Sequence, residues 1–235
     1  KISVRTRLLF TAFGAFIAVL LLGYGIDRID ILGIDFLLSI PLISIAFTVF
    51  AITGLANAYN IIDGFNGLAS MVGIITLVAL SYMGLKFNDL IITKLSFTMA
   101  CAILGFFIWN YPRGLIFLGD GGAYLIGFWI AIISVMIVSR HKEISPWFAV
   151  LINAYPIMET LFTIYRRKFN QGKSPGNPDG IHFHTLIFRR FLKSNAIKSE
   201  SKWFSANAKT SPYIWTLASL AIAPAIVFWN STPIL

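Results

Sequence analysis

Residues 57–70 have the sequence NAYNIIDGFNGLAS, which contains three asparagines and one aspartate. This polar stretch lies between two apolar runs, 36–56 and 68–85. A helix needs about 20 apolar residues to cross the hydrocarbon core of a bilayer. The sequence therefore predicts two membrane-spanning helices that are joined by a polar loop at the membrane surface.

The composition of the whole chain also indicates a membrane protein. Of its 235 residues, 57% are hydrophobic and only 12% are charged, and the mean hydropathy is +0.77. Soluble domains carry about 25% charged residues, so a soluble fold is excluded. We expect one integral membrane domain over residues 1–235, an all-α polytopic bundle of transmembrane helices. Seven spans are predicted, near residues 8–25, 36–56, 68–85, 90–109, 121–139, 146–165 and 212–231.

The basic residues predict which side of the membrane each loop faces, because Lys and Arg concentrate in cytoplasmic loops. With the N-terminus inside, fourteen of the nineteen Lys and Arg residues fall on the cytoplasmic side, ten of them in 166–210, which we expect to form a basic loop. The polar loops within 57–70, 109–122 and 178–190 fall on the same side; only RHKE, at 140–143, argues against this orientation. We expect a multi-pass protein of the inner (plasma) membrane with a cytoplasmic active site.

The net charge of +9 and the pI of about 9.8 do not imply that nucleic acid is a partner. Basic residues beside membrane spans attract anionic lipid headgroups or phosphorylated substrates equally well. We expect partners of these two kinds and no nucleic acid. The sequence indicates no oligomeric state, and because Cys101 is the only cysteine, no disulfide can form within the chain.

Asn57, Asn60 and Asp63 recur every three residues. On a helix this spacing confines them to an arc of about 120°, so they would face one target. Gly64 and Gly67 would then let the backbone approach a ligand closely. The alternative is a cap and turn at a helix end, where Asn, Asp and Gly are favoured. A cap needs only one such residue, so we favour a binding site.

Asp120 stands between glycines in FLGDGGAYLIGF, residues 117–128, at the mouth of a predicted span. Ionised groups at membrane depth are costly and usually face a partner or a water-filled cavity. Magnesium would be a fitting partner, because it takes few protein carboxylates and bridges to substrate phosphates. An ordinary helix N-cap is equally consistent with this motif taken alone.

His182, His184, Arg189 and Arg190 come together in PDGIHFHTLIFRR, residues 178–190. Two histidines at this spacing share a face only in an extended segment, and a third and a fourth ligand are missing, so zinc is not expected. Near a phosphate, imidazole and guanidinium groups would stabilise charge. The alternative is a solvated basic loop that follows the cytoplasmic bias of Lys and Arg.

Glu159 is the remaining acidic residue inside a predicted span. It lies about two helical turns before Arg166. We expect it to pack inside the bundle in a structural role, against a partner that the sequence does not identify.

The three motifs together, NAYNIIDGFNGLAS, WNYPRGLIFLGDGGAYLIGF and HFHTLIFRR, resemble the polyprenyl-phosphate N-acetylhexosamine-1-phosphate transferase family over residues 1–192. This family includes the phospho-N-acetylmuramoyl-pentapeptide translocase of peptidoglycan synthesis. The resemblance implies a polytopic helical enzyme that transfers a sugar 1-phosphate from a UDP-sugar to polyprenyl (undecaprenyl) phosphate and releases UMP. It also implies Mg²⁺, or Mn²⁺ in its place, at the cytoplasmic face.

The resemblance implies catalytic and metal-binding roles for individual residues. It makes Asp120 the magnesium ligand and brings Asn60 close to the metal and the diphosphate. It makes Asp63 an essential acid of the same loop. His182 and His184 match the family's histidine motif near the phosphates.

The resemblance also implies contacts with the substrate. Asn110 and Phe117 match positions that bind the uracil, by a hydrogen bond and by stacking respectively. We expect further substrate contacts from Asn57, Asn66 and Arg189.

Two positions depart from the family pattern. Asn66 stands where many members have aspartate, and Thr185 stands where a further histidine often occurs. These departures favour the initiation of a surface polysaccharide, such as lipopolysaccharide O-antigen, over peptidoglycan. The family also has a paired-aspartate motif just before the segment that SVRTRLLF, residues 3–10, resembles. We expect the chain to be a C-terminal portion without that motif.

Other functions stay open at this point. A transporter would carry polar residues midway through several spans, whereas the charges here cluster at one face. A CDP-alcohol phosphotransferase has several aspartates and an arginine around its DG motif, which DGFNGLAS does not match. The remaining alternative is a truncated, inactive relic or a non-catalytic membrane partner.

Overall fold

In the computed structural model, residues 3–172, 181–192 and 200–234 are described, and they form helices without any strand. The helices are α1 (Val4–Leu22), α2 (Ile34–Leu38), α3 (Pro41–Ile62), α4 (Leu68–Lys86), α5 (Leu90–Asn110), α6 (Gly119–Arg140), α7 (Pro146–Ile152), α8 (Ala154–Tyr165), η1 (Arg166–Asn170), α9 (Phe183–Ile187), η2 (Phe188–Leu192) and α11 (Glu200–Val227).

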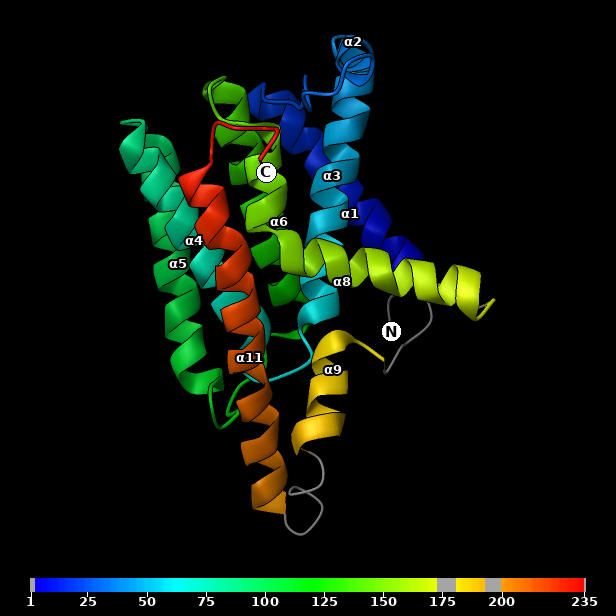
Figure 1. Cartoon of the computed structure of the whole chain (residues 1–235), viewed down its shortest axis with the longest axis vertical. Coiled ribbons are helices and arrows are strands. Elements are labelled where there is room, and N and C mark those ends of the chain that lie inside the picture. Colours follow the sequence, from blue (N-terminus) through cyan, green and yellow to red (C-terminus); the bar gives the residue numbers. More distant parts are fainter. Residues whose placement is uncertain (1–2, 173–180, 193–199, 235) are drawn as a thin grey trace.

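Six of these helices are long and apolar enough to cross a membrane: α1, α3, α4, α5, α6 and the Asn207–Val227 part of α11. The number rises to seven if the bent pair of α7 and α8 counts as one span. The long helices lie alongside one another, and α8 runs across them (Figure 1). Large apolar side chains such as Phe10, Leu42 and Phe50 are exposed on the outside of the bundle. The predicted all-α transmembrane bundle is therefore confirmed.

The segment 146–165, which the sequence predicts as one span, is broken between α7 and α8. α7 and the arm formed by α8 and η1 meet at an angle of 78°. Pro156 has no N–H and cannot donate to the carbonyl of Ile152, one helical turn earlier. The hydroxyl of Thr76, on α4, lies 3.3 Å from that carbonyl oxygen and donates to it instead. α8 consequently leaves the bundle sideways (Figure 1).

The predicted basic loop 166–210 contains several helical segments. η1 continues α8, and α11 begins at Glu200. His182 of the HFH motif is the N-cap of α9, the rest of the motif lies in α9, and the two following arginines lie in η2. Residues 173–180 and 193–199 of this segment lie outside the described part of the chain.

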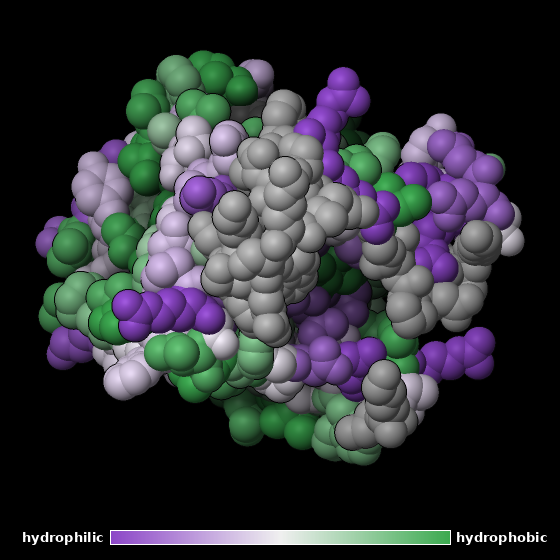
Figure 2. All heavy atoms as spheres, turned by 90° about the horizontal axis from the view of Figure 1, so that it is seen from below, coloured by the Kyte–Doolittle hydropathy of each residue, from purple (hydrophilic) through white to green (hydrophobic). Residues whose placement is uncertain are grey.

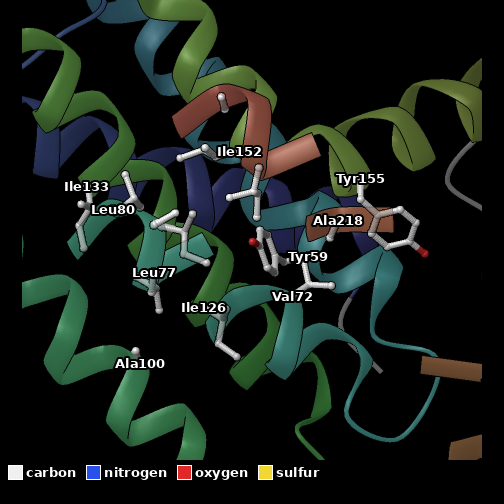
Figure 3. Packing of buried hydrophobic residues seen from close by; sticks show 14 of the residues in the cluster. Tyr59, Val72, Leu77, Leu80, Ala100, Ile126, Ile133, Ile152, Tyr155 and Ala218 are labelled. Carbon is white, nitrogen blue, oxygen red and sulfur yellow. The ribbon is translucent and has the colours of Figure 1, made fainter. Parts of the chain in front are cut away.

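The core of the bundle surrounds Tyr59 of α3, which is fully buried. Val72, Ile126 and Ile152 come from three other helices and lie around its ring (Figure 3). The Tyr59 hydroxyl is 3.4 Å from Asn153 Oδ1, at the break between α7 and α8. The helix break is thus anchored in the centre of the bundle.

α3 and α6 come into close contact at Gly127. A Cβ atom added there would lie 2.8 Å from the Cα of Ala56 and 2.9 Å from the backbone oxygen of Leu55. The two helices run in opposite directions, so the N-terminal end of α6 and the C-terminal end of α3 lie at the same end of the bundle. Asp120 is seven residues before Gly127 on α6, and Asp63 is seven residues after Ala56, at the end of α3, which is about two helical turns in each case. This contact therefore sets how far apart the two aspartates lie.

All three polar motifs lie at one end of the bundle. The loop between α3 and α4, the loop between α5 and α6, and helix α9 are in the lower half of Figure 1. Seen from below, hydrophilic residues gather on this end (Figure 2). The prediction that the three motifs share one side of the protein is confirmed.

The opposite end is held by its own ion pairs. The buried carboxylate of Asp89 accepts from Arg140 Nε at 2.6 Å and lies 3.0 Å from His141 Nε2. Asp27 pairs with Lys142 at 2.5 Å, and both side chains are half exposed. These contacts close the end of the bundle that carries none of the motifs.

The Gly127 contact makes a testable prediction about stability. Gly127→Ala would force α3 and α6 apart, because a backbone cannot move aside as a flexible side chain can, and overpacking of this kind costs about 1–3 kcal/mol. We expect a lower melting temperature in detergent. The matched control is Gly105→Ala on α5, where an added Cβ meets open space and where alanine favours the helix. Equal melting temperatures for the two variants would contradict the close contact.

Candidate active site

Asp63 and Asp120 form the acidic centre of the candidate site. Asp63 caps the C-terminal end of α3, and Asp120 lies in the first turn of α6. Burial, together with the negative charge of Asp120, raises the pKa of Asp63 to about 6. The predicted essential acid and the predicted magnesium ligand are therefore close enough to repel each other.

Arg7 is a part of the site that sequence reasoning missed. From α1, its Nη1 donates to Oδ2 of Asp120, and the guanidinium carbon lies 5.9 Å from the centre of the Tyr124 ring. A guanidinium is suited to phosphate as well as to carboxylate. In the sequence, Arg7 lies near Arg5 just before the first predicted span. From that position it was interpreted only as one of the basic residues that set the orientation in the membrane.

Asn57 connects the polar stretch of α3 to the start of α6. Oδ1 of Asn57 accepts from the hydroxyl of Tyr124, one turn after Asp120, at 2.8 Å. Asn60 lies between Asn57 and Asp63 and is partly exposed. Asn57, the first residue of the predicted arc, therefore contacts α6 one turn after Asp120.

Asn66 and Asn110 join the two loops of the site to each other. Oδ1 of Asn110 accepts from the backbone N–H of Gly67 at 2.6 Å, and its Nδ2 donates to the carbonyl of Ile116 at 2.7 Å. Nδ2 of Asn66 donates to the carbonyl of Pro112 at 3.1 Å. Asn110 is the residue predicted to bind the uracil by a hydrogen bond. Both polar atoms of its side chain already form hydrogen bonds inside the protein.

α11 supports the same loop from its other side. Asn207, Ser211 and Trp215 are spaced four residues apart and so share one stripe of the helix. Oδ1 of Asn207 accepts from the N–H of Asn66, while Ser211 and Trp215 donate to the carbonyls of Asn66 and Gly67. Sequence reasoning missed these three residues, although the i, i+4, i+8 spacing of polar and aromatic side chains is a visible signal.

His182 pairs with Glu159. Its Nδ1 lies 3.0 Å from Glu159 Oε1 and 3.3 Å from the hydroxyl of Thr163. The backbone N–H of Phe183 also donates to the Glu159 carboxylate, at 3.1 and 3.2 Å. The expectation that Glu159 packs inside against a partner is confirmed, and the partner is the histidine motif.

His184 is buried between α8 and the loop that follows Asp63. Its Nδ1 lies 3.1 Å from the Tyr155 hydroxyl, and its ring meets the Phe65 ring edge-on at 5.4 Å. A Cβ on Gly64 would lie 2.9 Å from His184 Nε2. Burial, with help from His182 and against the effect of Glu159, lowers the pKa of His184 to about 4. At pH 7 this imidazole is neutral and offers a hydrogen bond, not a charge.

The two remaining predicted residues lie on the surface of the site. Phe117 precedes α6 and is 75% exposed, as a side chain that stacks on a ligand would need to be. Arg189 is exposed on η2.

The acidic centre suits a divalent cation that the substrate helps to hold. Within the described part of the chain, no group of three His, Cys, Asp or Glu side chains is arranged to hold a metal alone. Magnesium usually takes one or two carboxylates and completes its shell with water and substrate phosphates. Asp120 is 66% exposed at its side chain, and a cation would offset its repulsion with Asp63. Asp120, together with Asn60 one turn before Asp63, could supply the protein ligands.

The model of "Glycosyl transferase family 4" matches residues 1–138, which is more than half of the chain and includes both aspartates of the acidic centre. The chain belongs to glycosyl transferase family 4. The family predicted from the three motifs is therefore confirmed.

Relatives in glycosyl transferase family 4 have named activities. A phospho-N-acetylmuramoyl-pentapeptide-transferase of Streptococcus thermophilus is 29% identical over 79% of this chain and 52% of its own length. A probable undecaprenyl-phosphate N-acetylglucosaminyl 1-phosphate transferase of Bacillus subtilis is 31% identical over 72% of this chain and 48% of its own length. The chain spans about half the length of the curated relatives it matches.

The burial of His184 predicts how stability depends on pH. Between its ordinary pKa of 6.5 and the folded value of about 4, the unfolded chain takes up a proton that the folded chain refuses. The free energy of unfolding therefore falls as the pH is lowered through this window, by about 1.4 kcal/mol per pH unit from this group. We expect His184→Asn to lose less thermal stability than the wild type between pH 7 and pH 5 in detergent. An equal loss in both proteins would contradict the buried, neutral imidazole.

Proposed function

We propose that this membrane protein transfers an N-acetylhexosamine 1-phosphate from a UDP-sugar to polyprenyl phosphate, with release of UMP, and so initiates a cell-surface glycan. The observation that carries the proposal is the pair of Asp63 and Asp120, brought together with Arg7 at the end of the bundle that also holds the histidine motif. Both named relatives act in sugar-phosphate transfer by their printed names.

The proposed reaction is an attack of one phosphate on another. A phosphate oxygen of the polyprenyl carrier attacks the β-phosphorus of the UDP-sugar, a bond to the carrier oxygen forms, and the bond to UMP breaks. The acceptor phosphate, with a second pKa of about 6, is already largely ionised at pH 7. A strong base is therefore unnecessary, because a weak base is enough for the fraction of acceptor phosphate that still carries a proton. The protein must also bind and orient two negatively charged substrates.

The acidic centre would hold the cation and the donor diphosphate. Asp120 and Asn60 would bind Mg²⁺, or Mn²⁺ in its place, with Asp63 beside them. When bound, the cation would neutralise phosphate charge and assist the departure of UMP. Arg7 would turn some of its N–H groups from Asp120 to a phosphate oxygen, for which its planar donors are suited.

The remaining residues would orient the two substrates. Phe117 is exposed where it could stack on the uracil, and Asn110 and Asn66 shape the loops on either side. A well-placed hydrogen-bond donor, such as one from the histidine motif, stabilises developing charge by about 3 kcal/mol in comparable sites. The basic bias of this end of the protein favours a cytoplasmic site, where UDP-sugars would be met.

The decisive variant is Asp120→Asn. We expect purified wild-type protein in liposomes to release UMP from a UDP-N-acetylhexosamine only with undecaprenyl phosphate and Mg²⁺. Asp120→Asn should lower turnover by more than about 100-fold, the scale of losing one main electrostatic contact to the reacting phosphates.

The matched control is Asp27→Asn. Asp27 is also a half-exposed aspartate in an ion pair. It lies in the segment between α1 and α2, and α2 is at the end of the bundle opposite the motifs (Figure 1). Its loss should leave turnover within about twofold, since surface ion pairs contribute little. Unchanged turnover in Asp120→Asn would refute the role of the acidic centre. Absence of UMP release from the wild type with every UDP-N-acetylhexosamine would refute the proposed activity.

A further inference from the structure

The two histidines of the HFH motif are held by the same helix. Tyr155 and Glu159 lie four residues apart on α8 and so on one face of it. The Tyr155 hydroxyl contacts Nδ1 of His184, and the Glu159 carboxylate contacts Nδ1 of His182. α8 thus engages the same ring atom of both imidazoles, but with two different chemical groups.

The carboxylate determines where His182 carries its proton. An ionised carboxylate has no proton and can only accept. The side chain of Glu159 is 2% exposed, and the N–H of Phe183 donates to both of its oxygens. Nδ1 of His182 must therefore carry a hydrogen and donate it to Glu159. In the neutral ring this leaves Nε2 with a free lone pair.

The phenol determines the opposite arrangement in His184. Tyr155 is buried, and His184 Nδ1 is the only acceptor in contact with its hydroxyl among the described residues. If the ring donated instead, the phenolic hydrogen would be buried without a partner, which costs about 1–3 kcal/mol. Nδ1 of His184 therefore accepts, and its hydrogen lies on Nε2, against Gly64.

The stacking of the two imidazole rings shows in which direction their Nε2 atoms point. The ring centres are 5.3 Å apart and the planes differ by 17°. Because both Nδ1 atoms face α8, both Nε2 atoms point away from it, on the side where the loop after Asp63 contacts His184. His182 is the more accessible of the two. Its side chain is 13% exposed, whereas the whole residue His184 is 2% exposed.

We propose that Tyr155 and Glu159 fix the two histidines in opposite tautomers, so that His182 presents Nε2 as a proton acceptor to the phosphate monoester of the lipid carrier. Glu159 is then a positioning residue for His182, and Tyr155 and His184 form a neutral link between α8 and the loop that holds Asp63. This assignment of roles rests on the proposed function, whereas the tautomers themselves do not.

The proton balance of this step is simple. Polyprenyl phosphate that still carries one hydrogen gives it to Nε2 of His182, which leaves the dianionic phosphate and an imidazolium. The Glu159 carboxylate stabilises that positive charge, as the aspartate does for the histidine of a catalytic triad. The other titratable groups around His182 are His184, which is stacked on it, and Arg166, whose Nη2 donates to the carbonyl of Ile181 at 2.7 Å.

The tautomers can be measured directly. The chain has three histidines, so protein labelled with ¹⁵N and ¹³C in histidine gives three ring spectra by magnetic resonance in detergent. His182→Asn and His184→Asn assign them, and His141, at the other end of the bundle, serves as the internal reference. We expect His182 to carry hydrogen on Nδ1 and not on Nε2, and His184 to carry it only on Nε2, at pH 7.

Two variants test which side chain sets each tautomer. Glu159→Gln keeps an oxygen for the N–H of Phe183 but removes the charge, and should release His182 into a mixture of tautomers while His184 stays unchanged. Tyr155→Phe should change the spectrum of His184 and leave His182 as it was. If His182 in the wild type lacks hydrogen on Nδ1, or if its spectrum is the same in Glu159→Gln, the proposal is overturned. The wild-type measurement decides even if a variant does not fold.

Kinetics separate positioning from a merely structural role. In Glu159→Gln we expect kcat for UMP release to fall at least tenfold while KM for the UDP-sugar stays within twofold, with partial rescue in Glu159→Asp. A rise in KM at constant kcat would overturn the assignment of His182 to the acceptor phosphate. If the wild type released no UMP but showed the expected tautomers, the proposed function would fall and the fixed tautomers would stand.

Discussion

The close contact of α3 and α6 at Gly127 is the constraint on which the site depends. Because the helices are antiparallel and touch at backbone distance, equal steps along each lead to Asp63 and Asp120. Any side chain at Gly127 would separate the helices and with them the two carboxylates. The repulsion between these carboxylates is then a built-in property of the fold, one that the guanidinium of Arg7 offsets through its ion pair with Asp120.

A second constraint is the break between α7 and α8. Pro156 prevents α8 from continuing α7, and Thr76 supplies the missing hydrogen bond from inside the bundle. The break turns α8 sideways, so that Tyr155 and Glu159 face the histidine motif instead of lying along a straight span. The loop after Asp63 is therefore held from three sides: by α8 through His184, by α11, and by the loop between α5 and α6.

The sequence predicted the parts of this account that depend on local pattern. Apolar runs gave the bundle, and the polar residues at their ends gave the motifs and the family. Contacts between distant segments were not predictable in the same way: no periodicity connects Arg7 with Asp120, or Glu159 with His182. Pro156 was visible as a helix breaker, but the continuous apolar run around it favoured one span. Asn66 and Asn110 were predicted to contact the substrate. Only the fold shows that these two residues also join two loops.

The central claim is that the acidic centre and the histidine motif form one site at one end of the bundle. Paramagnetic Mn²⁺ added with a UDP-N-acetylhexosamine tests it most directly, through the ring signals of the three histidines. The account predicts that the signals of His182 and His184 broaden, while that of His141, about 30 Å away along α6, stays sharp. Equal broadening of all three signals, or none at saturating Mn²⁺ and UDP-sugar, would contradict a shared site.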